Sequence, residues 1–351
     1  MTEETVKNPD SKEISVSAPC RIDMGGTLDI STFYYPLRHL SPCTFNIAVN
    51  LRTGVKISSW DKGMVKVSSR GFESAEYMLD EVPFSHPLGL MFAIAAYFRA
   101  GGVHIEIDSS SPPRSALGGS SSASVALVAG FFKLFDLVGK DALRQQSVIL
   151  AHALEESVAG VPCGLQDQLA AAYGGVNAWL WPCDIKAPLY KKKRVVPESR
   201  YKEIEKRIIL AYCGIPHESK NINTKWVKSF LSGKSRKQWQ EIISCTRKFV
   251  EAVSAFNFKD AVKLMNREMA VRKKMTPDVL DDMGAKLVDM AVKNSCGARF
   301  TGAGGGGCIW ALGEVEDIDR LRNIWKDTLS GRIDASLLDF KVDSDGILFH
   351  S

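Results

Sequence analysis

The sequence lacks the features that mark several large classes of protein. No stretch approaches the run of about 18 apolar residues that a membrane-spanning helix requires, and the polar start MTEETVKNPDSKE has no apolar signal-peptide core. None of the eight cysteines forms a C-x-x-C pair, so neither a zinc ribbon nor a redox-active dithiol is expected. A disulfide scaffold is not expected in a chain of 351 residues. These absences predict a protein of the reducing cytoplasm with no membrane partner.

The chain also has little excess charge of either sign. It carries 45 basic and 40 acidic residues, a formal net charge of +5. Its one dense basic run, KKKR at 191–194, stands alone without a basic stripe, so we interpret it as a solvated loop. We therefore expect no nucleic-acid partner, while the mild positive charge suits an anionic substrate.

Familiar nucleotide-binding and catalytic motifs are missing as well. The P-loop pattern fails because Lys228 stands where the first glycine should precede GKS at 233–235. There is no HRD or DFG, and no GxGxxG follows a strand. HES at 217–219 lacks the second histidine of HExxH. Any nucleotide site in this chain must therefore be of another kind.

The length predicts two domains. Residues 1–13 are expected to form a flexible tail, residues 14–190 an N-terminal domain of mixed strands and helices, and residues 191–351 a C-terminal domain. Charged amphipathic helices dominate the second domain. Its strands are expected at 207–214, 308–313 and 339–350.

A serine-rich turn at 112–124, PPRSALGGSSSAS, lies directly before an apolar helix. Glycine allows a positive φ and close backbone approach, and the first four N–H groups of a helix lack internal partners and carry partial positive charge. Small residues leave these groups open, which is the geometry that binds phosphate, and serine hydroxyls can ligate Mg²⁺. The alternative is an ordinary Gly/Ser turn with a capping side chain.

Four segments, taken together and in this order, resemble the GHMP kinases. They are APCRIDMGGTLD at 18–29, PPRSALGGSSSAS at 112–124, EESVAGVPCGLQDQLAAAYGG at 155–175 and GARFTGAGGGGC at 297–308. The resemblance implies a two-domain α+β fold, with an N-terminal mixed-sheet βαβ nucleotide domain and a C-terminal ferredoxin-like α+β domain. It also implies ATP and Mg²⁺ as cofactors and a monomer or homodimer.

The resemblance assigns residues to the nucleotide. It places the phosphates against Leu117, Gly118, Gly119, Ser120, Ser121 and Ser122, with support from Gly304 and Gly305. Either Ser120 or Ser121 would ligate Mg²⁺ together with Glu155. The turn departs from the family's usual GLGSSAA, because Arg114 and Ala116 stand where glycines are common. Arg114 would either contact a phosphate or point to solvent.

The resemblance also assigns the reacting end of the site. Asp167 is implied to orient or deprotonate the acceptor hydroxyl, and Arg21 to hold Asp167 ionised and steady the transferring group. Asp29 matches an aspartate that contacts substrate hydroxyls in sugar kinases, although Cys20 replaces a glycine and the motif is one residue short. The other acceptor-side candidates are Gly174, Gly175 and His217.

The implied reaction is in-line transfer of the γ-phosphoryl group of ATP to a hydroxyl of a sugar or sugar phosphate. GLQDQ and AAAYGG resemble the sugar 1-kinases, and ILAYCGIPHESKNI at 209–222 resembles the acceptor loop of the heptose 7-phosphate kinases, which favours the anomeric C1 hydroxyl. The alternatives are a galactokinase, a mevalonate- or homoserine-type alcohol kinase, and a non-catalytic sensor of ATP and sugar.

Overall fold

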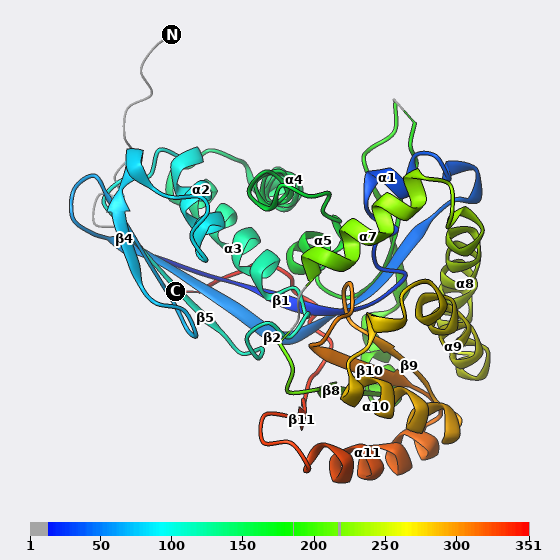
Figure 1. The fold of residues 1–351 in the computed structure, drawn as a ribbon. Helices are drawn as coiled ribbons and strands as arrows, with labels where there is room; N and C mark the ends of the chain where they lie inside the picture. The colour runs from blue at the N-terminus through cyan, green and yellow to red at the C-terminus, as the bar shows by residue number, and fades with distance from the viewer. Residues whose placement is uncertain (1–12, 185, 217–218, 351) are drawn as a thin grey trace.

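The structure is a computed structural model that describes residues 13–184, 186–216 and 219–350 (Figure 1). The predicted tail at 1–13 lies almost wholly outside these residues, as does His217. Within the described residues the chain forms a mixed eight-stranded sheet and a smaller antiparallel four-stranded sheet. This confirms the predicted α+β class.

The larger sheet has the order β12-β1-β2-β5-β3-β4, with β6 and β7 branching from β2. Its strands are β1 (Ile14–Met24), β2 (Cys43–Ser59), β3 (Met64–Ser69), β4 (Ala75–Met78), β5 (Val103–Ser109), β6 (Val176–Leu180), β7 (Lys191–Val196) and β12 (Leu348–His350). The long strand β2 pairs with β6 along its first half and with β5 along its second. Only the pairing of β3 with β5 is parallel among these described strands.

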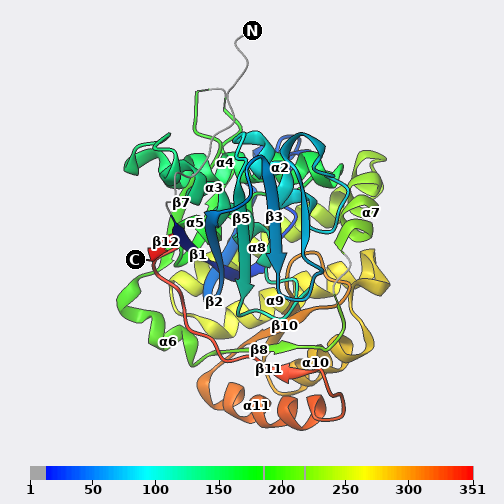
Figure 2. The same ribbon diagram turned by 90° about the vertical axis from the view of Figure 1, so that its left-hand side faces the viewer.

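Four helices cover one face of this sheet, as Figures 1 and 2 both show. They are α2 (Gly89–Tyr97), α3 (Gly119–Leu134), α4 (Lys140–Ala159) and α5 (Gln166–Tyr173). Helix α3 is buried at 13 of its 16 residues because it lies between the sheet and its neighbouring helices. Gly130 allows this close approach, since a Cβ there would lie 2.8 Å from Ile57 Cδ1. The apolar serine-rich segment is therefore a central helix whose start is held in place by packing.

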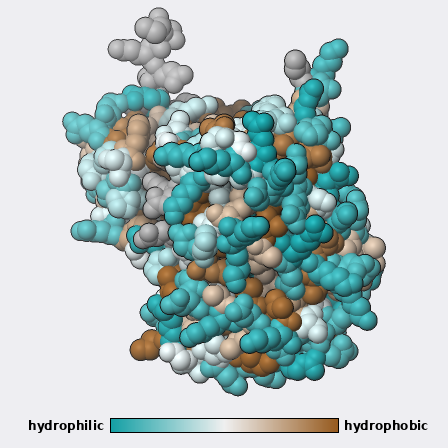
Figure 3. Space-filling model, turned by 45° about the vertical axis from the view of Figure 1, so that its right-hand side comes forward, coloured by the Kyte–Doolittle hydropathy of each residue, from teal (hydrophilic) through white to brown (hydrophobic). Residues whose placement is uncertain are grey.

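The smaller sheet has the order β11-β8-β10-β9, which is the order of a ferredoxin-like sheet. Its strands are β8 (Ile208–Tyr212), β9 (Gly297–Phe300), β10 (Cys308–Leu312) and β11 (Ser336–Leu337). The longer helices around it are α7 (Ser219–Leu231), α8 (Arg236–Ser254), α9 (Phe258–Met275), α10 (Asp282–Lys293) and α11 (Val315–Leu329). Their apolar stripes face inward, and hydrophilic side chains cover most of the face seen in Figure 3.

Short elements complete the described chain. They are the helices α1 (Ser31–Tyr34) and α6 (Tyr201–Glu205), and the 3₁₀ turns η1 (Arg38–Leu40), η2 (Leu79–Glu81), η3 (Glu198–Arg200) and η4 (Pro277–Val279). The two sheets share one apolar cluster, in which the Phe249 ring of α8 lies 5.3 Å from Phe45 of β2 and 6.4 Å from Trp310 of β10 between centroids. This packing holds the sheets beside each other.

Two sequence expectations are corrected. The KKKR run is not a loop: it forms the first four residues of the edge strand β7, whose backbone pairs with β6 while these four basic side chains are exposed. The strand expected at 339–350 is formed only at Leu348–His350 and joins β1 of the larger sheet. Both β7 and β12 lie beyond residue 190 yet belong to the larger sheet, so the division of the chain at that residue stays a prediction.

Two absences hold within the described part of the chain. All eight cysteines are free thiols. No described helix combines the length and apolar character needed to cross a bilayer.

Candidate active site

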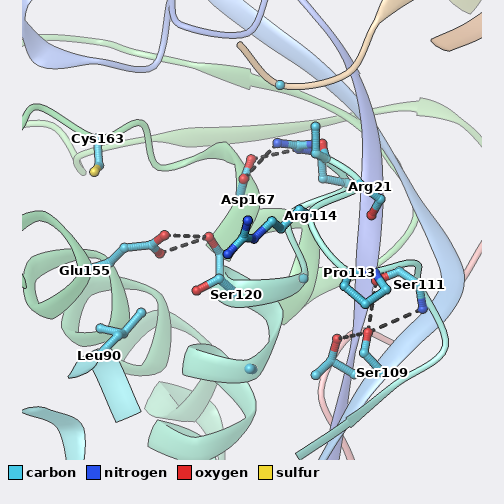
Figure 4. Close-up of a pocket in the computed structure, with 18 of the residues that line it drawn as sticks. Arg21, Leu90, Ser109, Ser111, Pro113, Arg114, Ser120, Glu155, Cys163 and Asp167 are labelled. Atoms are coloured by element: carbon cyan, nitrogen blue, oxygen red, sulfur yellow. Dashed lines mark hydrogen bonds and ion pairs between the residues drawn. The ribbon is translucent and has the colours of Figure 1, made fainter. Parts of the chain in front are cut away.

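A pocket of about 390 Å³ lies where the start of α3 meets β1 and the loop before α5. It draws its polar lining from all four segments singled out in the sequence, as Figure 4 shows in part. The polar residues from these segments are Arg21, Thr27, Asp29, Arg114, Ser115, Ser120, Ser121, Glu155, Gln166 and Asp167, and Gly302 contributes backbone. Segments more than 100 residues apart in the chain therefore form one site.

The turn before α3 is shaped as an anion site. Gly118 is in the left-handed region, with φ +79°, and a Cβ there would lie 3.2 Å from Asp167 Oδ2. No side chain caps the start of α3, so its first amides are left for another partner. Gly119 and Ser120 line the pocket at this point. The arrangement suits a phosphate group bound at the helix start.

The buried Ser121 and the half-buried Glu155 form a pair beside this turn. The Ser121 hydroxyl donates to both carboxylate oxygens of Glu155, at 2.9 and 3.1 Å, and Gln168 Nε2 donates to Oε2 at 2.7 Å. Burial, together with the nearby charge of Asp167, raises the pKa of Glu155 to about 7. A hydroxyl and a carboxylate oxygen are the hard ligands that Mg²⁺ prefers.

These residues fit a magnesium ion that is shared with phosphate. The Glu155 carboxylate has hydrogen-bond donors but no cation in ion-pair contact among the described residues. No group of three or more His, Cys, Asp or Glu side chains in the described chain could hold a metal by itself. Phosphate oxygens and water would have to complete the coordination, as is usual for Mg²⁺ at nucleotide sites.

Arg21 and Asp167 form a bidentate ion pair. Arg21 Nε donates to Asp167 Oδ1 at 2.7 Å and Nη2 donates to Oδ2 at 2.8 Å, while Nη1 donates to the carbonyl of Ala116 at 2.6 Å. Burial opposes the charged form of Arg21, but Asp167 and Asp23 outweigh this and raise the pKa of the guanidinium. The Asp167 carboxylate is thus held in one orientation beside the turn before α3, which we call the phosphate turn.

Asp29 is a second carboxylate of the pocket lining, and it is buried. Its Oδ2 accepts from the backbone N–H of Gln166 at 3.0 Å, and its Oδ1 has no partner among the described residues. Burial raises the pKa of Asp29 to about 6. A Cβ on Gly164 would lie 1.9 Å from Oδ2, so glycine is required there. The unpaired oxygen can accept a hydrogen bond from a ligand hydroxyl.

The raised pKa of Asp29 predicts how the stability of the protein depends on pH. In the folded protein its pKa is about 6, above its ordinary value of 3.8, so the folded state keeps a proton that the unfolded state loses first. Stability contributed by this group therefore falls as pH rises from about 4 to 6. The Asp29→Asn protein, which cannot ionise, is expected to be more stable than wild type by about 1–3 kcal/mol at pH 7.5. Urea denaturation at pH 7.5 and pH 4 should show this gain disappearing at the lower pH; an equal gain at both would contradict the assignment.

A buried ion cluster lies behind the pair of Arg21 and Asp167. Arg299 donates to Asp23 Oδ2 at 2.9 Å and to Glu268 Oε2 at 3.1 Å, and Arg272 donates to Glu268 Oε1 at 2.8 Å. Asp23 Oδ1 also accepts from the backbone N–H of Gly302 at 2.7 Å. All four charged side chains are fully buried. The cluster links β1 to α9 and to residues 301–307 between β9 and β10, the glycine-rich loop.

Several residues that were predicted to contact the nucleotide do not line the pocket and instead pack in the structure around it. Leu117 is fully buried in the apolar core, and the Ser122 hydroxyl donates to the carbonyls of Pro19 and Gly118, away from the pocket. Gly304 and Gly305 pack against η4, where Gly305 N–H donates to Val279 O at 2.8 Å. Their conformations serve the loop's own packing.

The glycine-rich loop contacts the phosphate turn through other residues. A Cβ on Gly307 would lie 2.6 Å from Ser115 O, and one on Gly302 would lie 3.4 Å from Ala116 O. The predicted contact between the two loops is therefore present in the structure, but Gly302 and Gly307 make it.

Gly174 and Gly175 do not reach the pocket, contrary to their prediction as acceptor residues. Both have positive φ, and Gly175 N–H donates to Asp343 O at 2.6 Å. A Cβ on Gly174 would lie 2.7 Å from Gly346 N. They turn the chain between α5 and β6 beneath the C-terminal segment. His217 lies outside the described residues, so its predicted role stays a prediction.

The sequence analysis missed the apolar end of the pocket and one polar residue of α7. The apolar end is lined by Phe72, Pro87, Leu88, Leu90, Met91, Ile107 and Pro113. Only Pro113 lies in one of the four segments singled out in the sequence; the others come from the start of α2, from β5 and from the loop after β3, with no motif in common. Asn223 of α7 also lines the pocket, and its buried Oδ1 has no partner among the described residues.

Comparisons with known proteins find similarity to kinases. The family model described as "GHMP kinases N terminal domain" matches residues 87–175. The D-glycero-alpha-D-manno-heptose 7-phosphate kinase of Campylobacter jejuni is 27% identical over 57% of this chain and 58% of its own length. A mevalonate kinase of Pyrococcus horikoshii is 23% identical over 76% of this chain and 80% of its own length.

The fold is shared with a solved kinase. The crystal structure of Lactococcus lactis galactokinase complexed with galactose superposes with a TM-score of 0.74 at 19% identity, covering 96% of this chain and 95% of that one. Residues 87–175 of the chain thus match the GHMP kinase N-terminal domain, and its two-sheet fold is that of the solved galactokinase.

Proposed function

We propose that this protein is an ATP-dependent kinase that transfers the γ-phosphoryl group of ATP to a hydroxyl of a sugar or sugar phosphate. One observation carries the proposal: Asp167, fixed by Arg21, faces the uncapped start of α3 within a single pocket. Phosphates bound at that helix start would lie beside the carboxylate that handles the acceptor hydroxyl. Phosphoryl transfer needs this juxtaposition more than any covalent chemistry.

Each end of the pocket has its own ligand in this proposal. The purine base would lie against the apolar end, and the phosphates against the start of α3. Ser121 and Glu155 would hold Mg²⁺, with Ser121 favoured over Ser120 because Ser121 makes the contact with Glu155. A magnesium ion bound there would offset the charge of the phosphate oxygens.

Asp167 acts on the acceptor. Its carboxylate accepts the hydrogen bond of the acceptor hydroxyl and takes or directs the proton as the new oxygen–phosphorus bond forms. The bond from phosphorus to the bridging oxygen breaks, and ADP leaves with its electron pair. Arg21 keeps the carboxylate oriented through both of its oxygens. The amides at the start of α3 stabilise the growing phosphate charge.

The acceptor end suits a molecule with several hydroxyl groups. Asp29 and Asn223 each present a buried oxygen without a partner among the described residues, and Thr27 lines the same space. Such oxygens need hydrogen-bond donors from a ligand. The match to a heptose 7-phosphate kinase supports a sugar phosphate as the acceptor, and we propose the anomeric C1 hydroxyl as the group that is phosphorylated. A mevalonate-type alcohol kinase is the second candidate, because the mevalonate kinase match covers 76% of the chain.

A kinase screen tests the proposal. Purified protein with ATP and Mg²⁺ is expected to release ADP with at least one acceptor from a panel of hexoses, heptoses, their phosphates, mevalonate and homoserine. Nuclear magnetic resonance of the product then locates the new phosphate. Turnover of mevalonate or homoserine without any sugar would select the second candidate. Binding of ATP and sugar with no turnover would indicate a sensor.

A further inference from the structure

The phosphate turn holds an arginine in a strained backbone conformation. Arg114 has φ +53° and Ala116 has φ +61°, both in the left-handed region that side chains other than glycine rarely adopt. Pro112 and Pro113 directly precede Arg114 and limit the freedom of the turn. Glycine would fit residue 114 without strain, so the arginine side chain is kept at a cost of about 1–3 kcal/mol. Such strain is common where a side chain must be presented to a ligand.

The Arg114 side chain is directed into the pocket. Figure 4 shows its guanidinium pointing from the turn toward the space between Ser120, Glu155 and Asp167, and Arg114 lines the same pocket as these residues. The side chain is exposed, and within the described residues no hydrogen bond or ion pair holds it. A cation is thus presented without a protein partner at the place where phosphates are proposed to bind.

The charge of the pocket favours such a cation in addition to Mg²⁺. Asp29, Glu155 and Asp167 line it, and a nucleotide triphosphate would add several more negative charges. No lysine is among the described lining residues. Arg21 is already paired with Asp167 through Nε and Nη2, and its Nη1 donates to the carbonyl of Ala116.

Arg70 is the remaining arginine of the described lining. It is exposed, and its Nη1 lies 4.0 Å from Asp108 Oδ1. Arg70 follows β3 and lies at the apolar end of the pocket, where the purine base is proposed to bind. Arg114 is therefore the cation placed to meet the β- and γ-phosphates.

We propose that Arg114 is a further catalytic residue, whose guanidinium binds the β- and γ-phosphate oxygens of ATP and stabilises the charge that develops on them during transfer. This inference rests on the proposed kinase function. The planar guanidinium can donate two parallel hydrogen bonds to phosphate oxygens. It remains protonated throughout, so the acceptor proton still goes to Asp167 or solvent and ADP still leaves with the electron pair of the broken bond.

Substitutions can separate the charge of Arg114 from its backbone. Arg114→Gly and Arg114→Asn both suit a left-handed backbone, so both proteins are expected to be at least as stable as wild type. Both should lose about 10³-fold in kcat, since an arginine at the transferring phosphoryl group contributes at least this much in related chemistry. ATP affinity should fall about tenfold and ADP affinity less than ATP affinity, because a γ-phosphate contact is lost. Arg114→Lys should recover only part of kcat, since it lacks the planar fork.

Two further measurements exclude a merely structural role. Free guanidinium ion at non-denaturing concentration is expected to restore part of the kcat of Arg114→Gly and none of that of Asp167→Asn. Arg236→Ala, which removes an exposed cation on α8, is the matched charge control and should keep wild-type kcat.

The outcomes distinguish this inference from the function on which it rests. Unchanged kcat and unchanged ATP affinity in Arg114→Gly and Arg114→Asn, with an active wild type, would overturn the role of Arg114 alone. A wild type that binds ATP without turnover would leave the affinity comparison as the deciding measurement. A wild type that binds no ATP would overturn both.

Discussion

The Asp167→Asn protein is expected to bind ATP as wild type does and to lose about 10²- to 10⁴-fold in kcat. Asparagine keeps the shape of the side chain and one acceptor for Arg21, but it can neither take a proton nor attract the hydroxyl hydrogen as a carboxylate does. The Arg21 contact at 2.7 and 2.8 Å also means that the group is already positioned, so the substitution removes chemistry more than geometry. Steady-state kinetics and calorimetric titration with ATP measure the two quantities separately.

A matched control for this substitution lies on the surface. Asp319 of α11 is exposed and far along the chain from the pocket, so Asp319→Asn should keep the wild-type rate. If Asp167→Asn also turns over at the wild-type rate, Asp167 is not the catalytic group and the proposed mechanism fails.

The Gly164→Ala protein is expected to lose stability and activity together. Its new Cβ would lie 1.9 Å from Oδ2 and 2.4 Å from Cγ of Asp29, so either the buried carboxylate or the loop leading to Asp167 must move. Overpacking of this kind costs about 1–3 kcal/mol, and a displacement near 1 Å in the site lowers kcat/KM by about 10²-fold. Thermal unfolding and kinetics with the best acceptor from the screen measure both effects.

Gly139 offers the comparison for a glycine with free space. A Cβ there meets nothing within 4 Å, and its φ is −66°, which alanine adopts without strain. Gly139→Ala should therefore stay within about 1 kcal/mol of wild type and keep its activity. Equal behaviour of the two alanine proteins would show that Asp29 is not confined by Gly164.

The buried ion cluster explains why the site was only partly visible in the sequence. Asp23, Glu268, Arg272 and Arg299 come from β1, α9 and β9, so their contacts span up to 276 residues. A charged residue in an amphipathic helix normally faces solvent, and Glu268 and Arg272 follow the spacing of an ordinary helical pair. Only the packing of α9 against β9 and against the turn after β1 buries them, which no local pattern records.

Other differences have similar causes. The strand β7 was read as a loop because four consecutive basic residues have no alternation, yet its backbone pairs with β6 and its side chains need only solvent. The apolar pocket end was missed because Phe72, Leu90 and Ile107 come from different elements. By contrast, the serine-rich turn was predicted well, since glycine conformation and helix amides are local properties.

The amino-acid sequence alone predicted the α+β class, the helix behind the serine-rich turn, and Arg21, Glu155 and Asp167 together with Ser120 or Ser121 as a set, because short motifs carry local backbone geometry and side-chain chemistry. Tertiary structure decided which of the predicted residues face the pocket. In the folded chain Ser122 and Leu117 lie in the core, and Gly174 and Gly175 lie under the C-terminal segment. Arg114 lies near Asp167 without a partner among the described residues. The reason is physical: burial and ion pairing depend on which distant segments pack together, and that packing is settled by the whole chain.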